Sequence, residues 1–371
     1  MKSIVTSVAL LLAVAATGVS QAQRPQMAED VFKNVQVLKG IPVDEFMDTM
    51  GMISASTGMN CVNCHASDGT TSWDKFADDT PLKETARKML LMVNSINKEN
   101  FKGVRSVTCY TCHNGIQRPK VVPSLLVQYG TPLEDPNEVL VFPNTGGPSP
   151  DEIFEKYFQA LGGRQKVANV TSFTAKGSYA GYDTDQVKSA IEIYAKSPNQ
   201  RSVIVHAPFG DSVRTCDGRA AWVASADKPL PVMSLTGGNL EGAKVEALST
   251  FPLQLRGAFN QWRVSLTAIE GKTVRVLQGT NPRQPPVNLY FDDSGLLVRF
   301  VRFVDTAIGR IPTQIDFSDY RDVEGVKVPF RWLWTWTDGQ STIELSEIKL
   351  NAPIDPAKFN KPAPALPPIS R

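Results

Sequence analysis

The N-terminal third of the chain carries two segments in which apolar residues recur with the period of an α-helix. In the first, Asp44 is placed to cap the helix. Its apolar stripe consists of Phe46, Met50 and Ile53. In the second, Thr80 and Pro81 form a helix start. Its stripe consists of Leu82, Ala86, Met89, Val93 and Ile96. The pattern predicts two amphipathic helices, with Met50 facing inward on one and Met89 at the centre of the other stripe.

A third helix is predicted after residues 117–147, which hold five prolines without a sustained period and are typical of a linker. Ser149 takes the cap position, Pro150 the first helical position, and Glu152 closes a capping box. The apolar face of this helix consists of Ile153, Phe154, Tyr157, Phe158 and Leu161. Gly162 and Gly163 are expected to end it.

Beyond this helix the apolar period changes to two, which predicts β-strands. The alternating runs are 191–194, 202–205, 287–291, 297–303, 330–334 and 342–345. Turn signals at 292–295 and 338–339 separate them. Strands at this spacing with few helices predict one antiparallel sheet that curls over its own apolar face. The fold class is therefore α+β and multidomain, with an α-helical N-terminal module and an antiparallel, β-rich half-barrel domain.

The first 22 residues are typical of a secretory signal peptide. Lys2 is followed by an apolar run over residues 4–14 and by a small-residue cleavage site at 20–22. Beyond this segment, no apolar run approaches the roughly 18 residues that cross a bilayer. The formal net charge of +2 is too small to indicate a nucleic-acid partner. We expect an exported protein, periplasmic in a bacterium, that is soluble or peripherally associated with a membrane.

Two copies of the motif Cys-x-x-Cys-His, at 61–65 and 109–113, use most of the cysteines and histidines in the chain. In each copy two thiols can reach the two vinyl groups of one porphyrin, while the adjacent histidine turns its imidazole onto the iron. This order of residues is the attachment signature of c-type haem. We predict two covalently bound haems. The attachment residues are Cys61, Cys64, Cys109 and Cys112, and the iron ligands include His65 and His113.

Other interpretations of the four cysteines are a zinc site, a pair of redox dithiols, or disulfides. A zinc site leaves the histidine after each second cysteine unexplained, and redox dithiols leave the repetition unexplained. Export also favours haem, because c-type haem is attached outside the cytoplasm. The remaining cysteine, Cys216, is interpreted as a buried or inert thiol. His206 is interpreted as a structural or exposed histidine.

Each haem iron needs a second axial ligand, and only His206 remains after His65 and His113 are used. Methionine is therefore the expected ligand, and stripe position favours Met50 for the first haem and Met89 for the second. The competing candidates are Met47 and Met52 near the first haem and Met92 near the second. Methionine ligation stabilises ferrous iron and raises the potential.

Several segments of the N-terminal module together resemble the cytochrome c subunits of photosynthetic reaction centres. They are 31–38, Met50, the first motif, 76–79, 86–90, Asn97 and 107–115. In that family a helix with an axial methionine precedes each motif, and haems pair about a local pseudo-twofold. The resemblance covers roughly residues 28–122 and implies that Met50 and Met89 are axial ligands. The photosynthetic subunits hold four haems, and dihaem relatives from non-phototrophic bacteria match the two motifs better.

The strand rhythm of the second half resembles, weakly, the half-barrel of periplasmic lipoprotein-carrier and sorting proteins, whose concave face binds acyl chains. The alternating aromatic residues Phe330, Trp332, Trp334 and Trp336 are interpreted as ordinary core. The chain shows no Ser-His-Asp grouping, phosphate loop or paired carboxylates with credible spacing.

We therefore divide the chain into five parts. They are a signal peptide (1–22), a dihaem cytochrome c domain (23–122), a linker (123–148), an antiparallel β domain (149–356) and a proline-rich tail (357–371). The expected function is electron transfer between a donor and an acceptor redox protein. The β domain is expected to dock a partner or membrane complex, or to bind a hydrophobic ligand. A dihaem oxidoreductase such as a peroxidase, or a lipid carrier with a redox module, remains an alternative.

Overall fold

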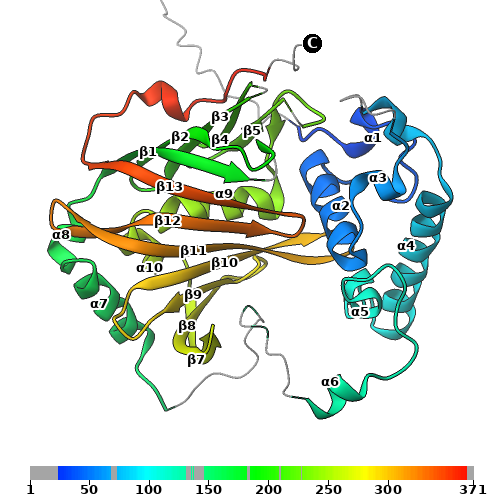
Figure 1. Ribbon diagram of the computed structural model, residues 1–371, viewed down its shortest axis with the longest axis horizontal. Coiled ribbons are helices and arrows are strands. Elements are labelled where there is room, and N and C mark those ends of the chain that lie inside the picture. The colour runs from blue at the N-terminus through cyan, green and yellow to red at the C-terminus, as the bar shows by residue number, and fades with distance from the viewer. Residues whose placement is uncertain are drawn as a thin grey trace, which may run out of the picture.

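The computed structural model describes residues 24–67, 73–130, 135, 137, 146–181, 184–208, 210–226 and 228–365. The predicted signal peptide, most of the linker and the end of the tail lie outside the described residues. A helical N-terminal part is followed by a part that is built on one large sheet (Figure 1). The predicted α+β class is confirmed.

The helical part contains two long helices and several short ones. They are α1 (Ala28–Val31), α2 (Val43–Thr57), α3 (Cys61–Cys64), the 3₁₀ helix η1 (Asp74–Ala77), α4 (Pro81–Asn100), α5 (Cys109–His113) and α6 (Leu125–Tyr129). The predicted start of α4 is confirmed, because the Thr80 hydroxyl accepts a hydrogen bond from the Lys83 N–H at 3.2 Å. The long helices α2 and α4 are the two that apolar periodicity predicts.

The prediction that Asp44 caps α2 is wrong. Pro42 takes the N-cap position, and Asp44 lies within the first turn, where it is 2% exposed. Its carboxylate accepts hydrogen bonds from the Thr236 N–H at 2.6 Å and the Thr236 hydroxyl at 2.8 Å. Periodicity could not reveal this partner, which lies far along the chain, and the carboxylate joins α2 to the sheet part.

Among its described residues, the second part holds a 13-stranded sheet in which every pairing is antiparallel. The strands are β1 (Ser172–Gly181), β2 (Ser189–Lys196), β3 (Gln200–Ala207), β4 (Gly210–Cys216), β5 (Ala221–Ala224), β6 (Met233–Ser234), β7 (Gln261–Ile269), β8 (Lys272–Thr280), β9 (Val287–Phe291), β10 (Leu297–Thr306), β11 (Gly309–Val323), β12 (Val326–Trp336) and β13 (Gly339–Leu350). Their order is β6-β5-β4-β3-β2-β1-β13-β12-β11-β10-β9-β8-β7, so that the first and last long strands of this part meet at its centre.

The remaining helices accompany this sheet. They are α7 (Pro150–Ala160), α8 (Arg164–Ala168), α9 (Gly237–Ser249), α10 (Pro252–Gly257) and the 3₁₀ helix η3 (Pro356–Phe359). Helix α9 contacts both β3 and β10, which five strands separate in the sheet order. The sheet must therefore curl around α9, as the predicted half-barrel requires. In Figure 1, α9 lies behind the sheet.

The largest apolar cluster lies entirely within the second part. Helix α7 contributes Phe154 and Phe158, which are 1% and 0% exposed, and the sheet contributes Phe300, also 0% exposed. The predicted capping box of α7 is confirmed, with the Glu152 carboxylate accepting from the Ser149 N–H at 2.7 Å. Phe330 and Trp332 belong to this core, Trp334 packs against it partly buried, and Trp336 is half-buried.

Two smaller apolar clusters join the helical part to the sheet part. One brings Met52 of α2 and Leu90 of α4 against Ile308 and Ile311, at the turn between β10 and β11. The other brings Val43 against residues near β5 and β6. These shared clusters fix α2, the helix that carries Met50, against the sheet.

Candidate cofactor sites

Both Cys-x-x-Cys-His motifs fold as one short helical turn that side chains from the motif itself stabilise. In the first, Asn60 and Asn63 exchange hydrogen bonds between side chain and backbone N–H at 2.8 and 3.2 Å. In the second, the Thr111 hydroxyl accepts from the Thr108 N–H at 3.0 Å. Such reciprocal bonds satisfy the free N–H groups of a helix start. Because the two cysteines of each motif occupy one turn, their thiols lie close together.

The first motif opens onto a cavity of about 390 Å³. This volume lies within the roughly 300–1,000 Å³ of typical ligand pockets. Its lining includes Cys61, Cys64 and His65 together with Met50 from α2. Aromatic walls come from Phe32, Phe46, Trp73 and Phe76. The structure thus brings all four residues that the sequence assigns to the first haem to one cavity of suitable size and character.

The imidazole of His65 is held in one tautomer by the backbone. Its Nδ1 lies 3.0 Å from the carbonyl oxygen of Phe76, which can only accept, so Nδ1 carries the hydrogen. The lone pair is thereby left on Nε2, the arrangement that metal-ligating histidines adopt. Burial lowers the pKa of His65, and the charges of Lys83 and Arg87 lower it further, against the raising effect of the Phe76 carbonyl. The neutral imidazole that can bind a metal is therefore favoured.

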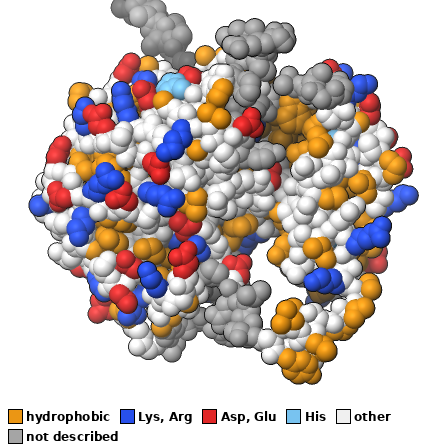
Figure 2. Space-filling view, in the orientation of Figure 1, with side chains coloured by type: hydrophobic (Ala, Val, Ile, Leu, Met, Phe, Trp, Pro, Cys, Tyr) orange, Lys and Arg blue, Asp and Glu red, His pale blue; other side chains and the backbone are white. Residues whose placement is uncertain are grey.

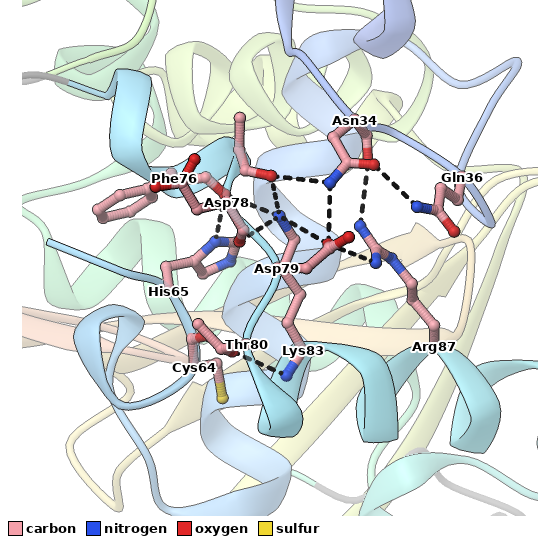
Figure 3. A network of polar contacts seen from close by, with 11 residues as sticks. Asn34, Gln36, Cys64, His65, Phe76, Asp78, Asp79, Thr80, Lys83 and Arg87 are labelled. Atoms are coloured by element: carbon pink, nitrogen blue, oxygen red, sulfur yellow. Dashed lines mark hydrogen bonds and ion pairs between the residues drawn. The ribbon is translucent and has the colours of Figure 1, made fainter.

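The Phe76 carbonyl is itself fixed by a polar network (Figure 3). The Lys83 ammonium donates to the carbonyls of Phe76 and Ala77 at 2.8 and 3.0 Å. Arg87 donates to the Asp79 carboxylate at 2.7 Å and to the Asn34 carbonyl at 3.1 Å, and Asn34 donates to Asp79 at 2.8 Å. The segments that carry the family resemblance are thus brought together, and they orient the histidine.

The second motif repeats this arrangement of the histidine. His113 Nδ1 lies 3.1 Å from the carbonyl of Ile116, so its Nε2 also holds the lone pair. The loop that leads into this motif is fixed by Asn97, which is 6% exposed. Its amide donates to the Val107 carbonyl at 2.7 Å and accepts from the N–H groups of Ser106 and Val107 at 3.0 and 2.9 Å. In the sequence, only the resemblance to the reaction-centre cytochrome family indicated Asn97.

Exposed apolar side chains occur in the second motif and along α4, the long helix that contacts α5. Met89, Met92, Phe101 and Tyr110 are 39%, 46%, 40% and 50% exposed. Figure 2 shows apolar side chains over this side of the helical part. The buried face of α4 differs from the apolar stripe that the sequence predicts. Leu90 and Val93 are buried, whereas Met89 is exposed. Uncovered apolar surface around the motif fits a large apolar cofactor that covers it.

Helix α2 links the two motifs. Its last turn ends at Gly58, which has a left-handed φ of 66°. A Cβ at Gly58 would lie 2.4 Å from the Gly115 carbonyl oxygen, just beyond the second motif. The Gly115 N–H donates to the Ser56 carbonyl at 2.9 Å. One helix therefore lines the first site and contacts the chain that follows the second.

The alternative axial candidates occupy different places. Met47 lines the first cavity with Met50, whereas Met52 packs in the cluster against β10 and β11 and is absent from the cavity lining. Met59 also lines the cavity, and sequence reasoning missed it because it follows the helical stripe and stands two residues before Cys61. Two residues from the sheet part, Pro229 and Asp338, complete the wall. No local sequence signal could have indicated them.

The cysteines do not assemble into a metal tetrad. Across the parts of the chain that the structure describes, no three Cys, His, Asp or Glu side chains converge as a metal site. Burial raises the pKa values of Cys61, Cys64 and Cys109, which keeps them as thiols. Cys216 is 3% exposed, as predicted, and burial raises its pKa as well.

Two other candidate features lie in the sheet part. His206 is exposed, as interpreted, and its Nδ1 lies 2.8 Å from the Asp211 carboxylate. An apolar cavity between α7 and the sheet, lined by residues such as Phe173, Phe317 and Trp332, measures only about 80 Å³. Among the described residues, no helix combines the length and apolarity that crossing a membrane requires.

Comparison with known proteins supports the sequence-based resemblance. Residues 5–130 match the family model of the photosynthetic reaction centre cytochrome C subunit. The subunit of Thermochromatium tepidum is 37% identical over 97 residues, which are 25% of this chain and 23% of that protein. The subunit of Rubrivivax gelatinosus is 35% identical over 112 residues, 29% of this chain and 28% of that protein. The chain thus spans about a quarter of the length of these relatives.

Solved structures similar to the sheet part include a LolA superfamily protein from Nitrosomonas europaea. It is 15% identical, with a TM-score of 0.38, and the match covers 58% of this chain and 99% of that one. Another is a domain of an outer membrane lipoprotein-sorting protein from Vibrio parahaemolyticus, 11% identical with a TM-score of 0.37 over 57% of this chain and 95% of that one. The resemblance of the N-terminal part to the cytochrome c subunits of photosynthetic reaction centres is confirmed, and that family implies covalently bound c-type haem.

Proposed function

We propose that this chain is an exported dihaem c-type cytochrome that transfers electrons between a donor and an acceptor protein. One observation carries the proposal: Cys61, Cys64, His65 and Met50 line a single cavity, and the histidine presents a free Nε2. These groups are the complete set that a His/Met c-type haem needs.

In the first site, each residue has a distinct role. The thiols of Cys61 and Cys64 would form the thioether attachments, and His65 Nε2 and the Met50 sulfur would hold the iron. The bound haem would supply one-electron exchange between ferric and ferrous iron. The aromatic lining excludes water, and Lys83 and Arg87 hold the loop that orients His65.

In the second site, Cys109 and Cys112 are the proposed attachment residues, and His113 is the proposed proximal ligand. Met89 is the proposed axial partner, because it lies exposed on α4 and is not part of the buried stripe. Met92 is exposed in the same way and is the nearest competitor. The contact between α2 and α5 supports a pair of sites in one module.

If His65 with Met50 and His113 with Met89 hold the two irons, no ligand position would be left for a substrate, so the proposed role is that of an electron carrier. Export through residues 1–22 would place the protein in the periplasm, soluble or peripherally bound to a membrane. The β domain is proposed to dock the module on a partner or membrane complex. The cavity of about 80 Å³ in this domain is well below the roughly 300 Å³ of small ligand sites and does not favour a lipid carrier.

The proposal is tested by counting haems in the purified, exported protein. A pyridine haemochrome assay and intact mass should give two haems per chain. Cys61→Ala/Cys64→Ala and Cys109→Ala/Cys112→Ala should each lose one haem, whereas Cys216→Ala, at the cysteine outside both motifs, should retain two. One haem in the parent protein, or zinc in place of iron, would refute the proposal.

The class of activity is tested with the same preparation. Stopped-flow mixing with a soluble cytochrome or copper protein should give fast electron exchange, and peroxide turnover with a small donor should be slow. Fast peroxide turnover that is lost in His206→Ala would move the protein to the peroxidase class instead.

A further inference from the structure

The turn between β12 and β13 reaches the first cofactor site. Its residues Thr337 and Asp338 approach Gly51 of α2, the neighbour of Met50. A Cβ at Gly51 would lie 2.9 Å from the Thr337 hydroxyl oxygen and 3.8 Å from the Asp338 carboxylate. A larger residue at position 51 would have to displace at least the Thr337 side chain. Asp338 also lines the cavity that holds Met50, Cys61 and His65.

Polar bonds hold α2 in this position against the sheet part. Asp44 accepts from Thr236 at 2.6 and 2.8 Å, and the Asn239 amide donates to the Asp48 carboxylate at 2.5 Å. Arg105 of the helical part donates to the Thr306 carbonyl at the end of β10. Thr236 and Asn239 belong to the start of α9, around which the sheet curls. The position of the β12–β13 turn relative to Met50 is therefore set by the whole β domain.

The Asp338 carboxylate is close enough to the first motif to act on it electrostatically. Burial raises the pKa of the Cys61 thiol most, and the negative charge of Asp338 raises it further. The positive charge of Lys228 lowers it. The cations in the cavity lining have other partners. Lys83 and Arg87 are bound to carbonyls and to Asp79, and Lys33 pairs with Asp74 at 3.2 Å.

We propose that the β12–β13 turn forms a wall of the first haem site and that the Asp338 carboxylate lowers the midpoint potential of that haem. This inference rests on the proposed function. A negative charge beside the cofactor favours the ferric form, whose charge is one unit more positive, by Coulomb attraction. Charge and hydrogen bonding around a haem are recognised means of setting its potential. The β domain would thus separate the potentials of two haems that have the same ligand types.

The test uses the full, haem-loaded protein and a spectroelectrochemical titration. Asp338→Asn removes the charge with little change of shape, and it should raise one of the two midpoints while the other stays at its parent value. The midpoint that moves should be the one missing from Cys61→Ala/Cys64→Ala. The shift should shrink as ionic strength rises, because Asp338 is exposed to solvent. The matched control is Asp319→Asn, which removes an exposed carboxylate on β11 that does not line the cavity.

A second variant tests the wall itself. Gly51→Ala should displace the turn and move the same midpoint, with both haems retained. Unchanged midpoints in Asp338→Asn, or equal shifts of both, would overturn the inference and leave a two-haem carrier intact. Haem counting on the parent protein separates this outcome from failure of the proposed function, since a parent without two haems would remove the basis of both.

Discussion

A buried carboxylate in the β domain, that of Glu246, is expected to contribute strongly to the stability of the sheet part. Glu246 of α9 is 1% exposed and is surrounded by three arginines from three strands. Arg302 of β10 donates to its carboxylate, and Arg201 of β3 and Arg214 of β4 lie 3.6 and 3.7 Å from it. Replacing the carboxylate in Glu246→Gln removes the counter-charge of three guanidiniums, of which those of Arg201 and Arg302 are buried and that of Arg214 is half-buried. The contacts of the sheet around α9 should therefore weaken.

The magnitude follows from the titration of this group. Burial alone raises the pKa of Glu246, but Arg214, Arg302 and Arg201 outweigh it and lower the pKa from 4.5 to about 2. At roughly 1.36 kcal/mol per pH unit, a lowering of this size corresponds to about 3 kcal/mol of stability. Breaking a buried ion pair typically costs about 3–5 kcal/mol. Because the folded pKa is depressed, the contribution is complete above about pH 4.5 and is lost as the pH falls toward 2.

Urea unfolding followed by tryptophan fluorescence measures this contribution. At pH 7 we expect Glu246→Gln to be less stable than the parent by about 3 kcal/mol. The difference should close as the pH is lowered from 5 toward 2, since the parent carboxylate then becomes protonated. Glu344→Gln, which removes an exposed carboxylate paired with Lys188 at 2.9 Å, is the matched control and should leave the stability nearly unchanged, because water screens an exposed ion pair. A Glu246→Gln protein as stable as the parent at pH 7 would refute the reasoning.

Three further predictions concern the two parts of the chain. Met50→Ala and Met89→Ala should each remove about half of the sulfur-to-iron charge-transfer absorbance of the oxidised protein and lower one midpoint potential. If these variants keep the absorbance and Met47 or Met92 variants lose it, the ligands are Met47 or Met92 instead. Asn97→Ala should destabilise the chain by about 1 kcal/mol in urea unfolding and reduce occupancy of the second haem, because three partly buried hydrogen bonds to the backbone are lost. Asn100→Ala, at an exposed position on the same helix, is its control. A fragment of residues 148–371 should be folded, as judged by circular dichroism, since the largest apolar cluster lies within 153–350. It should be less stable than the full chain, because two apolar clusters include residues of the helical part. An unfolded fragment would show that the sheet requires the helical part.

The sequence by itself determined the local structure and the chemistry. Cys-x-x-Cys-His is a local motif, because one helical turn brings both thiols and the imidazole together, and no distant residue is needed to recognise it. The capped start of α7, the stripe of α2 that lines the first cavity and the extended run of β10 are likewise determined by neighbours in sequence. Several strands were not predicted. One is β11, whose first half alternates in burial but contains a proline and polar residues, and whose second half is largely exposed.

Tertiary structure decided what lies across long sequence separations. Asp44 looks like a helix cap in sequence, yet it is used to bind Thr236, because a buried carboxylate is stabilised by whichever donors the fold brings to it. Met89 has the spacing of a core residue, yet packing against the sheet selects the adjacent Leu90 and leaves Met89 available on the surface. The approach of Asp338 to Gly51 has no sequence signal, since it depends on a sheet that curls around α9 and on the clusters that dock α2 against it. The sequence determined which groups can hold a cofactor, and the packing of two distant parts decided the wall and the charge that surround it.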